Sequence, residues 1–140
     1  MVFVRNQIRP LAVAVVRHKN KILAMEGYDS VKQETFYRLI GGGIEFGEKA
    51  EDTVVREFRE ELGLDIKVTR FLGTSENIFT YEGKPGHEIV LFFEAEFVAR
   101  EMYDKEIRTI EKELSENRIV WVEPAENLHI YPEGFRKYIL

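Results

Sequence analysis

The chain has 140 residues, of which 44% are hydrophobic and 32% are charged, and its formal net charge is −5. This size and composition predict a single compact domain over residues 1–140 and exclude a disordered chain. The absence of cysteine excludes disulfides, zinc–thiolate sites and thiol nucleophiles, and it agrees with a cytoplasmic location. The acidic balance argues against a broad nucleic-acid-binding surface, and no apolar run is long enough to suggest a membrane span.

The first half of the chain predicts three strands and one helix. Valine-rich residues 11–17, a polar turn at 18–21 and residues 22–26 predict a β-hairpin. Residues 35–40 predict a short strand that leads into a glycine-rich turn. Residues 49–62 predict a helix, because apolar residues recur on one stripe and Gly63 is a natural C-terminal cap. We expect this stripe to pack in the core; it consists of Ala50, Val54, Phe58 and Leu62.

The second half predicts further strands and two short helices. Residues 65–73 are β-like, and residues 77–82 and 87–98 predict a long hairpin with its turn at 83–86. The polar segment 100–117 predicts a loop or a short exposed helix, and 118–122 predicts a strand. Short helices are expected at 124–128 and 133–140. This order of elements predicts an α/β or α+β fold in which a mixed β-sheet packs against helices.

Residues 41–64 combine glycines with an acidic helix. Gly41, Gly42, Gly43 and Gly47 precede a helix that carries Glu57, Glu60 and Glu61. Carboxylates at positions i, i+3 and i+4 lie on one helical face, where they repel one another. A divalent cation explains this arrangement, since Mg²⁺ prefers carboxylate oxygens and bridges to substrate phosphates. The sequence therefore predicts a magnesium site on this helix.

The same stretch resembles the Nudix box in full. The pattern is Gly42, five residues, Glu48, seven residues, then Arg56-Glu57-Phe58-x-Glu60-Glu61-x-Gly63-Leu64; Phe58 stands where an aliphatic residue is usual. The resemblance implies a Nudix-type α/β/α sandwich with a mixed β-sheet. It also implies a Mg²⁺-dependent hydrolase, with Mn²⁺ as a substitute, that cleaves the diphosphate linkage of a nucleoside diphosphate joined to another moiety.

The resemblance also implies roles for individual residues. Glu60 and Glu61 would be metal ligands, and Glu57 would be a ligand or the general base. Arg56 would orient these carboxylates, and Glu48 would contact the glycine turn or the water shell of the metal. The carbonyl oxygen of Gly41 would be a further ligand.

One more acidic ligand is expected from the loop that precedes the strand at 118–122. Glu111, Glu113 and Glu116 lie there, and Glu113 and Glu116 are the preferred candidates between which spacing does not choose.

Several residues outside the box are candidates for substrate binding. Arg38 is placed to hold a phosphate or to be a charge at a strand edge. Tyr81 is placed to stack on a base, although packing on its neighbours in a strand is the favoured interpretation. His87 is more often structural than functional in such a position. The aromatic residues Phe36, Tyr37 and Phe79 either line a base pocket or belong to the core.

The residues leave the substrate and part of the function open. A nucleotide sugar, a nucleoside triphosphate or a dinucleoside polyphosphate all fit the motif, and the resemblance allows a homodimer. One alternative is a catalytically silent, Nudix-like module that binds and senses a nucleotide. Another is a purely structural role for the acidic helix, as a calcium or charge feature. Retention of every box carboxylate favours the enzyme over the silent module.

Overall fold

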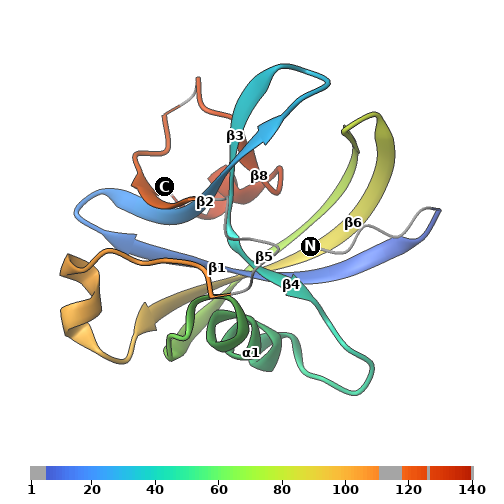
Figure 1. Ribbon diagram of the computed structural model, residues 1–140. Coiled ribbons are helices and arrows are strands. Elements are labelled where there is room, and N and C mark those ends of the chain that lie inside the picture. Colours follow the sequence, from blue (N-terminus) through green and yellow to red (C-terminus); the bar gives the residue numbers. More distant parts are fainter. Residues whose placement is uncertain (1–5, 111–117, 126, 140) are drawn as a thin grey trace.

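The computed structural model describes residues 6–110, 118–125 and 127–139. A large, curled mixed β-sheet forms most of it, with one α-helix against one face and the C-terminal segment against the other (Figure 1). The predicted mixed α+β architecture is therefore confirmed. None of the helices in these ranges is long and apolar enough to cross a membrane.

Strand β1 (Ile8–His18) lies at the centre of the sheet. From Ile8 to Val16 it pairs in parallel with β6 (Lys84–Phe97). On its other edge it pairs with β4 (Ile40–Gly43) and then, near its end, with β2 (Lys21–Asp29). The predicted first hairpin is confirmed, and both of its strands are longer than expected.

The chain between residues 34 and 43 changes partner halfway. Strand β3 (Glu34–Arg38) pairs with β2, whereas β4 pairs with β1. At the break, the buried Leu39 donates its backbone N–H to the carbonyl of Tyr131 at 2.9 Å. The predicted turn at Gly41–Gly43 is wrong, because these glycines end β4 and the turn follows at residues 44–49. The lack of side chains lets β4 lie tightly against β1, since a Cβ on Gly41 would collide with the backbone of Ala12.

Strand β5 (Ile66–Tyr81) unites the two strands predicted at 65–73 and 77–82. It pairs with β6 throughout, with irregularities at Val68/Arg70 and Phe71/Gly73. The polar residues 74–76 that suggested a break pair regularly with β6. Further pairings complete the sheet. Strand β7 (Arg118–Val122) lies against β2, and β8 (Ile130–Tyr131) lies parallel to β3.

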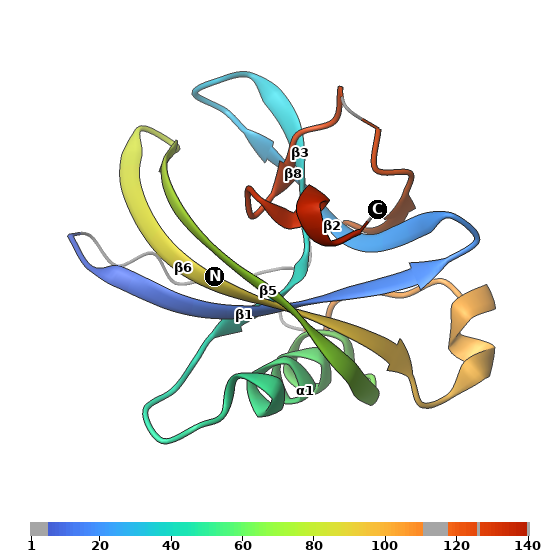
Figure 2. The ribbon, with the colours of Figure 1, turned by 180° about the vertical axis from the view of Figure 1, so that it is seen from behind.

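Helix α1 (Ala50–Leu62) covers one face of the sheet, as Figures 1 and 2 show from opposite sides. Its predicted stripe is confirmed as core: Val54 and Phe58 are fully buried, Leu62 is nearly so, and Ala50 is half-buried against them. Gly63 ends the helix in the left-handed conformation, with φ of 66°, as the C-cap prediction requires.

The opposite face is covered by the C-terminal segment. Phe135 and Ile139 are buried there with Leu11, Val13 and Val15 of β1. The helix predicted at 133–140 is only a 3₁₀ turn, η3 (Phe135–Tyr138). The polar segment contains a second 3₁₀ turn, η1 (Arg100–Asp104), as one of the two predictions for it allowed.

The helix predicted at 124–128 is wrong for the residues that can be described there. The Arg136 guanidinium donates to the carbonyls of Pro124, Ala125 and Leu128 at 2.8–3.0 Å. The Ala125 carbonyl also accepts from the Leu128 amide at 3.1 Å, so the segment forms a single turn whose carbonyls are tied to Arg136.

Candidate active site

Arg56 on α1 fastens the preceding loop to the helix. Its Nε and Nη2 donate to the two oxygens of Glu48 at 2.8 and 3.0 Å, a bidentate pair, and Nη2 also donates to the carbonyl of Gly43 at 3.1 Å. The bond from Arg56 holds the pKa of Glu48 down at about 2, helped by the Thr53 hydroxyl, which donates to Glu48 at 2.8 Å. Glu48 is therefore ionised and committed to the loop, which fits its expected supporting role.

Arg56 also contacts two of the three glutamates predicted to bind the metal. Its Nη1 donates to Glu57 at 3.0 Å and to Glu60 at 3.2 Å. The Glu57 side chain is mostly buried, whereas that of Glu60 is 48% exposed. These bonds are those expected of an arginine that orients the two carboxylates; whether the carboxylates bind a metal stays a prediction.

Glu61 is a buried carboxyl group. Its residue is only 7% exposed, and burial raises the pKa of Glu61 to about 8; Arg38 acts against this shift, while the charge of Glu57 and a hydrogen bond to it add to the shift. Two carboxyl groups in such proximity share a proton unless a cation is present. The Glu57 carboxylate in turn lies against β4, where a Cβ on Gly42 would come within 2.5 Å of it.

This donor set fits a hard divalent cation. Among the described residues no three Asp, Glu or His side chains are already gathered as a metal site. The buried Glu61 nevertheless needs a positive charge to ionise, and its oxygens and those of Glu57 are ligands that Mg²⁺ or Mn²⁺ accepts. Glu60 lies one turn away from Arg56 on the same helix. Glu113 and Glu116, the candidates for the extra ligand, lie outside the described residues.

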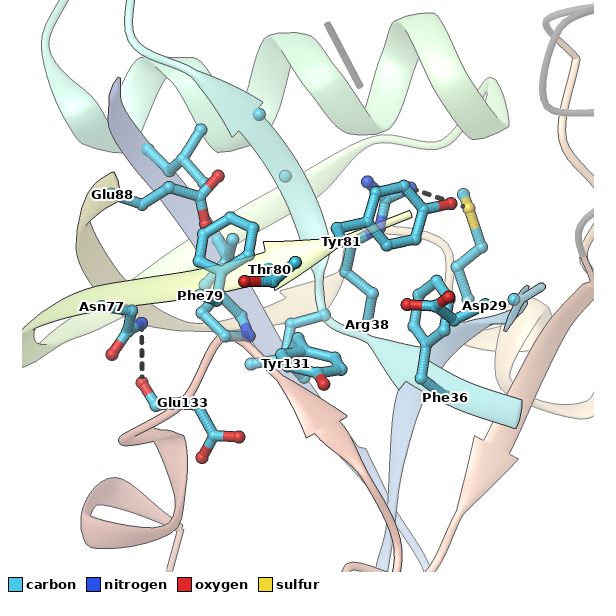
Figure 3. Close-up of a pocket in the computed structure, with 18 of the residues that line it drawn as sticks. Asp29, Phe36, Arg38, Asn77, Phe79, Thr80, Tyr81, Glu88, Tyr131 and Glu133 are labelled. Carbon is cyan, nitrogen blue, oxygen red and sulfur yellow. Dashed lines mark hydrogen bonds between the residues drawn. The ribbon is translucent and has the colours of Figure 1, made fainter. Parts of the chain in front are cut away.

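A cavity of about 290 Å³ opens beside this acidic group. Gly41 and Gly42 of β4 line one end, and aromatic side chains line much of the rest. Figure 3 shows that Phe36, Phe79, Tyr81 and Tyr131 surround the space, with Glu88 and Asn77 at one side. The cavity thus joins the glycine backbone next to Glu57 to a ring-lined chamber.

The rings are held edge to face. Phe36 meets Tyr81 at a centroid distance of 5.7 Å and Tyr131 at 5.7 Å, with interplanar angles of 81° and 78°. Phe36 lies close over Gly27 and Phe79 over Gly86, because these glycines leave room on the neighbouring strands. Tyr81 remains 38% exposed. A wall of this kind offers flat faces to a planar, aromatic ligand.

Most of the substrate-binding candidates lie at this cavity. Arg38, Tyr81, Phe36 and Phe79 line it, whereas Tyr37 packs into the core cluster under the C-terminal segment. Arg38 Nη2 donates to the sulfur of Met25 at 3.1 Å (Figure 3).

His87 is not among the residues that line the cavity. It lies on β6 next to Glu88, so its side chain leaves the opposite face of the strand, and its Nε2 is 3.0 Å from the Glu76 carboxylate. The geometry gives no support to a role for His87 in the cavity.

Three residues at or near the cavity did not emerge from the sequence: Arg9, Glu88 and Tyr131. Glu88 is buried and forms an ion pair with Arg9, with Nη1 and Oε2 3.7 Å apart. A signal did exist for Glu88, because it precedes Val90 and Phe92 on the alternating face of a hydrophobic strand. Tyr131 carried no such signal, since it comes from a two-residue strand that only the folded sheet defines.

The fold and the site together define a class of protein: a mixed α+β domain with an acidic helix beside a ring-lined cavity. Comparison with known families identifies it further. The family described as NUDIX domain matches residues 8–139, so the chain belongs to that family.

Curated relatives resemble part of the chain. A protein named NAD-capped RNA hydrolase NudC from Pseudomonas aeruginosa is 34% identical over 70 residues, which is half of this chain and 23% of the relative. A putative mutator protein MutT4 from Mycobacterium tuberculosis is 30% identical over 91 residues, 65% of this chain and 37% of the relative. The chain therefore spans well under half the length of these relatives.

Solved structures share the fold over nearly the whole chain. A MutT NUDIX hydrolase from Burkholderia pseudomallei has a TM-score of 0.64 at 21% identity and covers 96% of this chain and 100% of its own. A MutT protein from Methanosarcina mazei Go1 has a TM-score of 0.61 at 19% identity, with 96% and 92% covered. At these identities the likeness concerns the fold alone.

Proposed function

We propose that the protein is a Mg²⁺-dependent hydrolase that cleaves the diphosphate linkage of a small nucleotide. The observation that carries the proposal is the continuity of the cavity, which runs from the glycine backbone beside the Glu57 carboxylate to a wall of aromatic rings. A diphosphate at one end and a base at the other fit this arrangement. Membership of the NUDIX domain family supports the same reaction class.

Each part of the site has a distinct task in this proposal. Glu57 and Glu61 would hold the metal together with Glu60, and the backbone carbonyl of Gly41 would add a ligand. Arg56 keeps Glu57 and Glu60 in place through its two bonds from Nη1. When bound, the cation neutralises the diphosphate and lowers the pKa of the attacking water.

The chain's own residues supply binding and proton handling. Arg38 lines the cavity near the carboxyl cluster and would hold a phosphate, while Phe36 and Tyr81 would stack against a base. Glu57 is the candidate base or ligand. The coupling between Glu57 and Glu61 means that the proton from water would be taken by the pair rather than by one defined residue.

The substrate is proposed as a class. Nucleotide sugars, nucleoside triphosphates and dinucleoside polyphosphates share the diphosphate that the site is built to hold. The relatives named NAD-capped RNA hydrolase add dinucleotides such as NAD to the candidates. A cytoplasmic location and assembly as a homodimer remain predictions beside this proposal.

A phosphate-release screen over these four classes tests the proposal, with phosphatase and pyrophosphatase added to free inorganic phosphate from the monophosphate and pyrophosphate products. Activity is expected with Mg²⁺ or Mn²⁺ and is expected to disappear with a chelator, for at least one class. The competing function is nucleotide binding without turnover. Calorimetry that detects nucleotide binding with Mg²⁺, while no product forms with any class, would establish that alternative instead.

A further inference from the structure

A second arginine, which the proposed mechanism does not use, lies next to Glu88, one of the residues that line the cavity. Arg9 lies on β1, two residues before the buried Leu11, and its side chain is only 16% exposed. Strand alternation places it on the same face as Leu11 and Val13, which both line the cavity. Its Nη2 lies close above Gly43, where a Cβ would come within 3.3 Å. Arg9 thus borders the glycine end of the cavity, next to the acidic helix.

The hydrogen bonding of Arg9 is incomplete. Its Nη1 is buried and has no hydrogen-bond partner among the described residues. The nearest carboxylate oxygen, on Glu88, is 3.7 Å away, which is an ion pair but is too long for a hydrogen bond. A buried donor without an acceptor is costly, and a ligand that supplies the acceptor recovers that cost.

A second guanidinium faces the same place. Burial lowers the pKa of Arg9, and the positive charge of Arg38 lowers it further, while Glu88 and Glu57 act in the opposite direction. Arg38 lines the cavity and forms no ion pair shorter than 4.0 Å with any described carboxylate. Its guanidinium donates to the Met25 sulfur, which is a weak acceptor.

Few of the described carboxylates form ion pairs with these two arginines. Glu88 is the only carboxylate in an ion pair with either arginine in the part of the chain that the structure describes, and Glu57 is already bonded to Arg56. Two guanidiniums that repel each other at the rim of a cavity favour an anion between them. Guanidinium groups match phosphate oxygens in geometry, because each offers a planar fork of donors.

We propose that Arg9 and Arg38 together form an anion subsite for the diphosphate, between the acidic helix and the aromatic chamber. Glu88 is the positioning residue of this subsite: its ion pair holds the Arg9 guanidinium beside the cavity and balances part of the charge when no ligand is bound. The inference rests on the proposed function, since it assigns the same cavity to a diphosphate. It adds a binding contribution from the protein itself, independent of the metal.

The test is the binding of inorganic pyrophosphate, measured by calorimetry at low salt with a chelator and no divalent metal. The wild-type protein is expected to bind pyrophosphate. Arg9→Gln is expected to weaken binding by about tenfold or more, as for loss of a charge-assisted hydrogen bond. The affinity of Arg9→Lys for pyrophosphate is expected to lie between those of the wild type and Arg9→Gln, because lysine keeps the positive charge but lacks the planar pair of donors of a guanidinium.

Two further variants separate a binding role from a structural one. Glu88→Gln removes the competing carboxylate and leaves Arg9 in place, so pyrophosphate is expected to bind about twofold or more tightly. Arg70→Gln is the matched control, because Arg70 on β5 is also paired with a glutamate of β6, Glu94, but its side chain is exposed whereas that of Arg9 is mostly buried. It is expected to bind pyrophosphate like the wild type.

Three results would overturn the subsite. The first is no binding of pyrophosphate by the wild type, and the second is equal binding by Arg9→Gln and Arg70→Gln. The third is weaker binding by Glu88→Gln, which would show that the ion pair only supports the fold. If Arg9→Gln does not fold, Arg9→Lys and Glu88→Gln decide. The binding test involves neither metal nor turnover, so its outcome is independent of the hydrolysis assay. The subsite proposal can therefore be wrong while the proposed hydrolase activity is correct, and the activity can be wrong while the subsite is correct.

Discussion

Gly42 and Gly41 are adjacent glycines with different reasons to lack a side chain. At Gly42 an added Cβ would meet the end of the flexible Glu57 side chain, at 2.5 Å from its carboxyl carbon. At Gly41 it would meet the backbone of β1, which cannot move aside. The absence of a side chain at Gly42 therefore leaves room for the Glu57 carboxylate, and its absence at Gly41 allows β4 to pair closely with β1.

Alanine at these two positions is expected to separate activity from stability. Gly42→Ala should keep its melting temperature within a few degrees of the wild type, because only Glu57 needs to move, and should lose hydrolysis by about tenfold or more. Gly41→Ala should instead lower the melting temperature clearly. Thermal denaturation and the hydrolysis assay on both variants check this, and a Gly42→Ala enzyme with full activity would remove Glu57 from the proposed site.

Glu61 should make the metal-free protein less stable at alkaline pH. Its folded-state pKa of about 8 lies above that of an exposed glutamate, so the folded protein binds the extra proton. The stabilisation is complete below the ordinary glutamate pKa and is lost as the pH rises through about 8. The free energy of unfolding should fall by on the order of 5 kcal/mol over this window, because a tenfold change in proton affinity between the unfolded and folded states corresponds to about 1.4 kcal/mol.

Glu61→Gln should flatten this pH dependence, measured by urea unfolding with a chelator between about pH 5 and pH 9. Some slope should remain, because burial also raises the pKa of Glu88. An unchanged slope in the variant would mean that Glu61 does not carry the extra proton.

Helix α1 has an apolar face that packs in the core and a charged face that carries the candidate site residues. One face buries Phe58 and Val54 completely against the sheet, and the other carries the carboxylates and Arg56. Phe58 stands where the family usually has an aliphatic residue, and the structure accommodates the ring among Ala12, Ala14 and other core residues. The departure from the motif is thus absorbed by small residues on β1.

Phe58→Ala is expected to destabilise the protein by about 3–5 kcal/mol, through lost burial and the cavity left behind. Denaturant unfolding measures this change. Phe58→Leu, the residue type usual in the motif, should cost much less. Equal costs for both variants would show that the ring is not packed as described.

Helices and strands could be predicted where all the residues that determine them lie close together in the sequence. The helix, its stripe, its glycine cap and the acidic residues all lie within residues 41–64, so periodicity and spacing were sufficient. Prediction failed where partners come from elsewhere in the chain. The glycines of β4 look like a turn until β1 is beside them, and the carbonyls of Pro124, Ala125 and Leu128 accept hydrogen bonds from Arg136, a residue outside the segment.

The same limit applies to the site. The box residues were found from one contiguous motif, and Arg38 and Tyr81 were found as candidates. The Arg9–Glu88 pair was not found, because it depends on the parallel register of β1 and β6, in which these two residues are partners. Residues so far apart in the chain become neighbours only through the sheet.

At the scale of the molecule, two distant hairpin tips are joined beside the cavity. The Ser30 amide and hydroxyl donate to the two oxygens of Glu82, at 3.1 and 2.8 Å. The Asp29 carboxylate accepts from the amides of Val31 and Lys32, and more weakly from that of Glu82 at 3.5 Å. Since Asp29 and Tyr81 line the cavity, these bonds hold its two walls together.

Glu82→Ala should loosen both tips without unfolding the core. Hydrogen exchange should become about tenfold faster or more in residues 28–34 and 79–84, while β1 and α1 stay protected. Glu76→Ala is a suitable control, because Glu76 lies on β5, the strand that leads to the Glu82 turn, but bonds to His87 away from the cavity. The same exchange rates in both variants would contradict a link between the walls.

The acidic face of α1 is central to the proposed function, as a metal-dependent hydrolytic centre. The most direct measurement is the hydrolysis rate of Glu60→Gln with Mg²⁺ on the best substrate from the screen, beside Glu51→Gln, an exposed glutamate of the same helix. We expect a folded Glu60→Gln protein with turnover at least about a hundredfold lower, and a control close to wild type. A Glu60→Gln enzyme that turns over as fast as the control would contradict a hydrolytic centre on this helix.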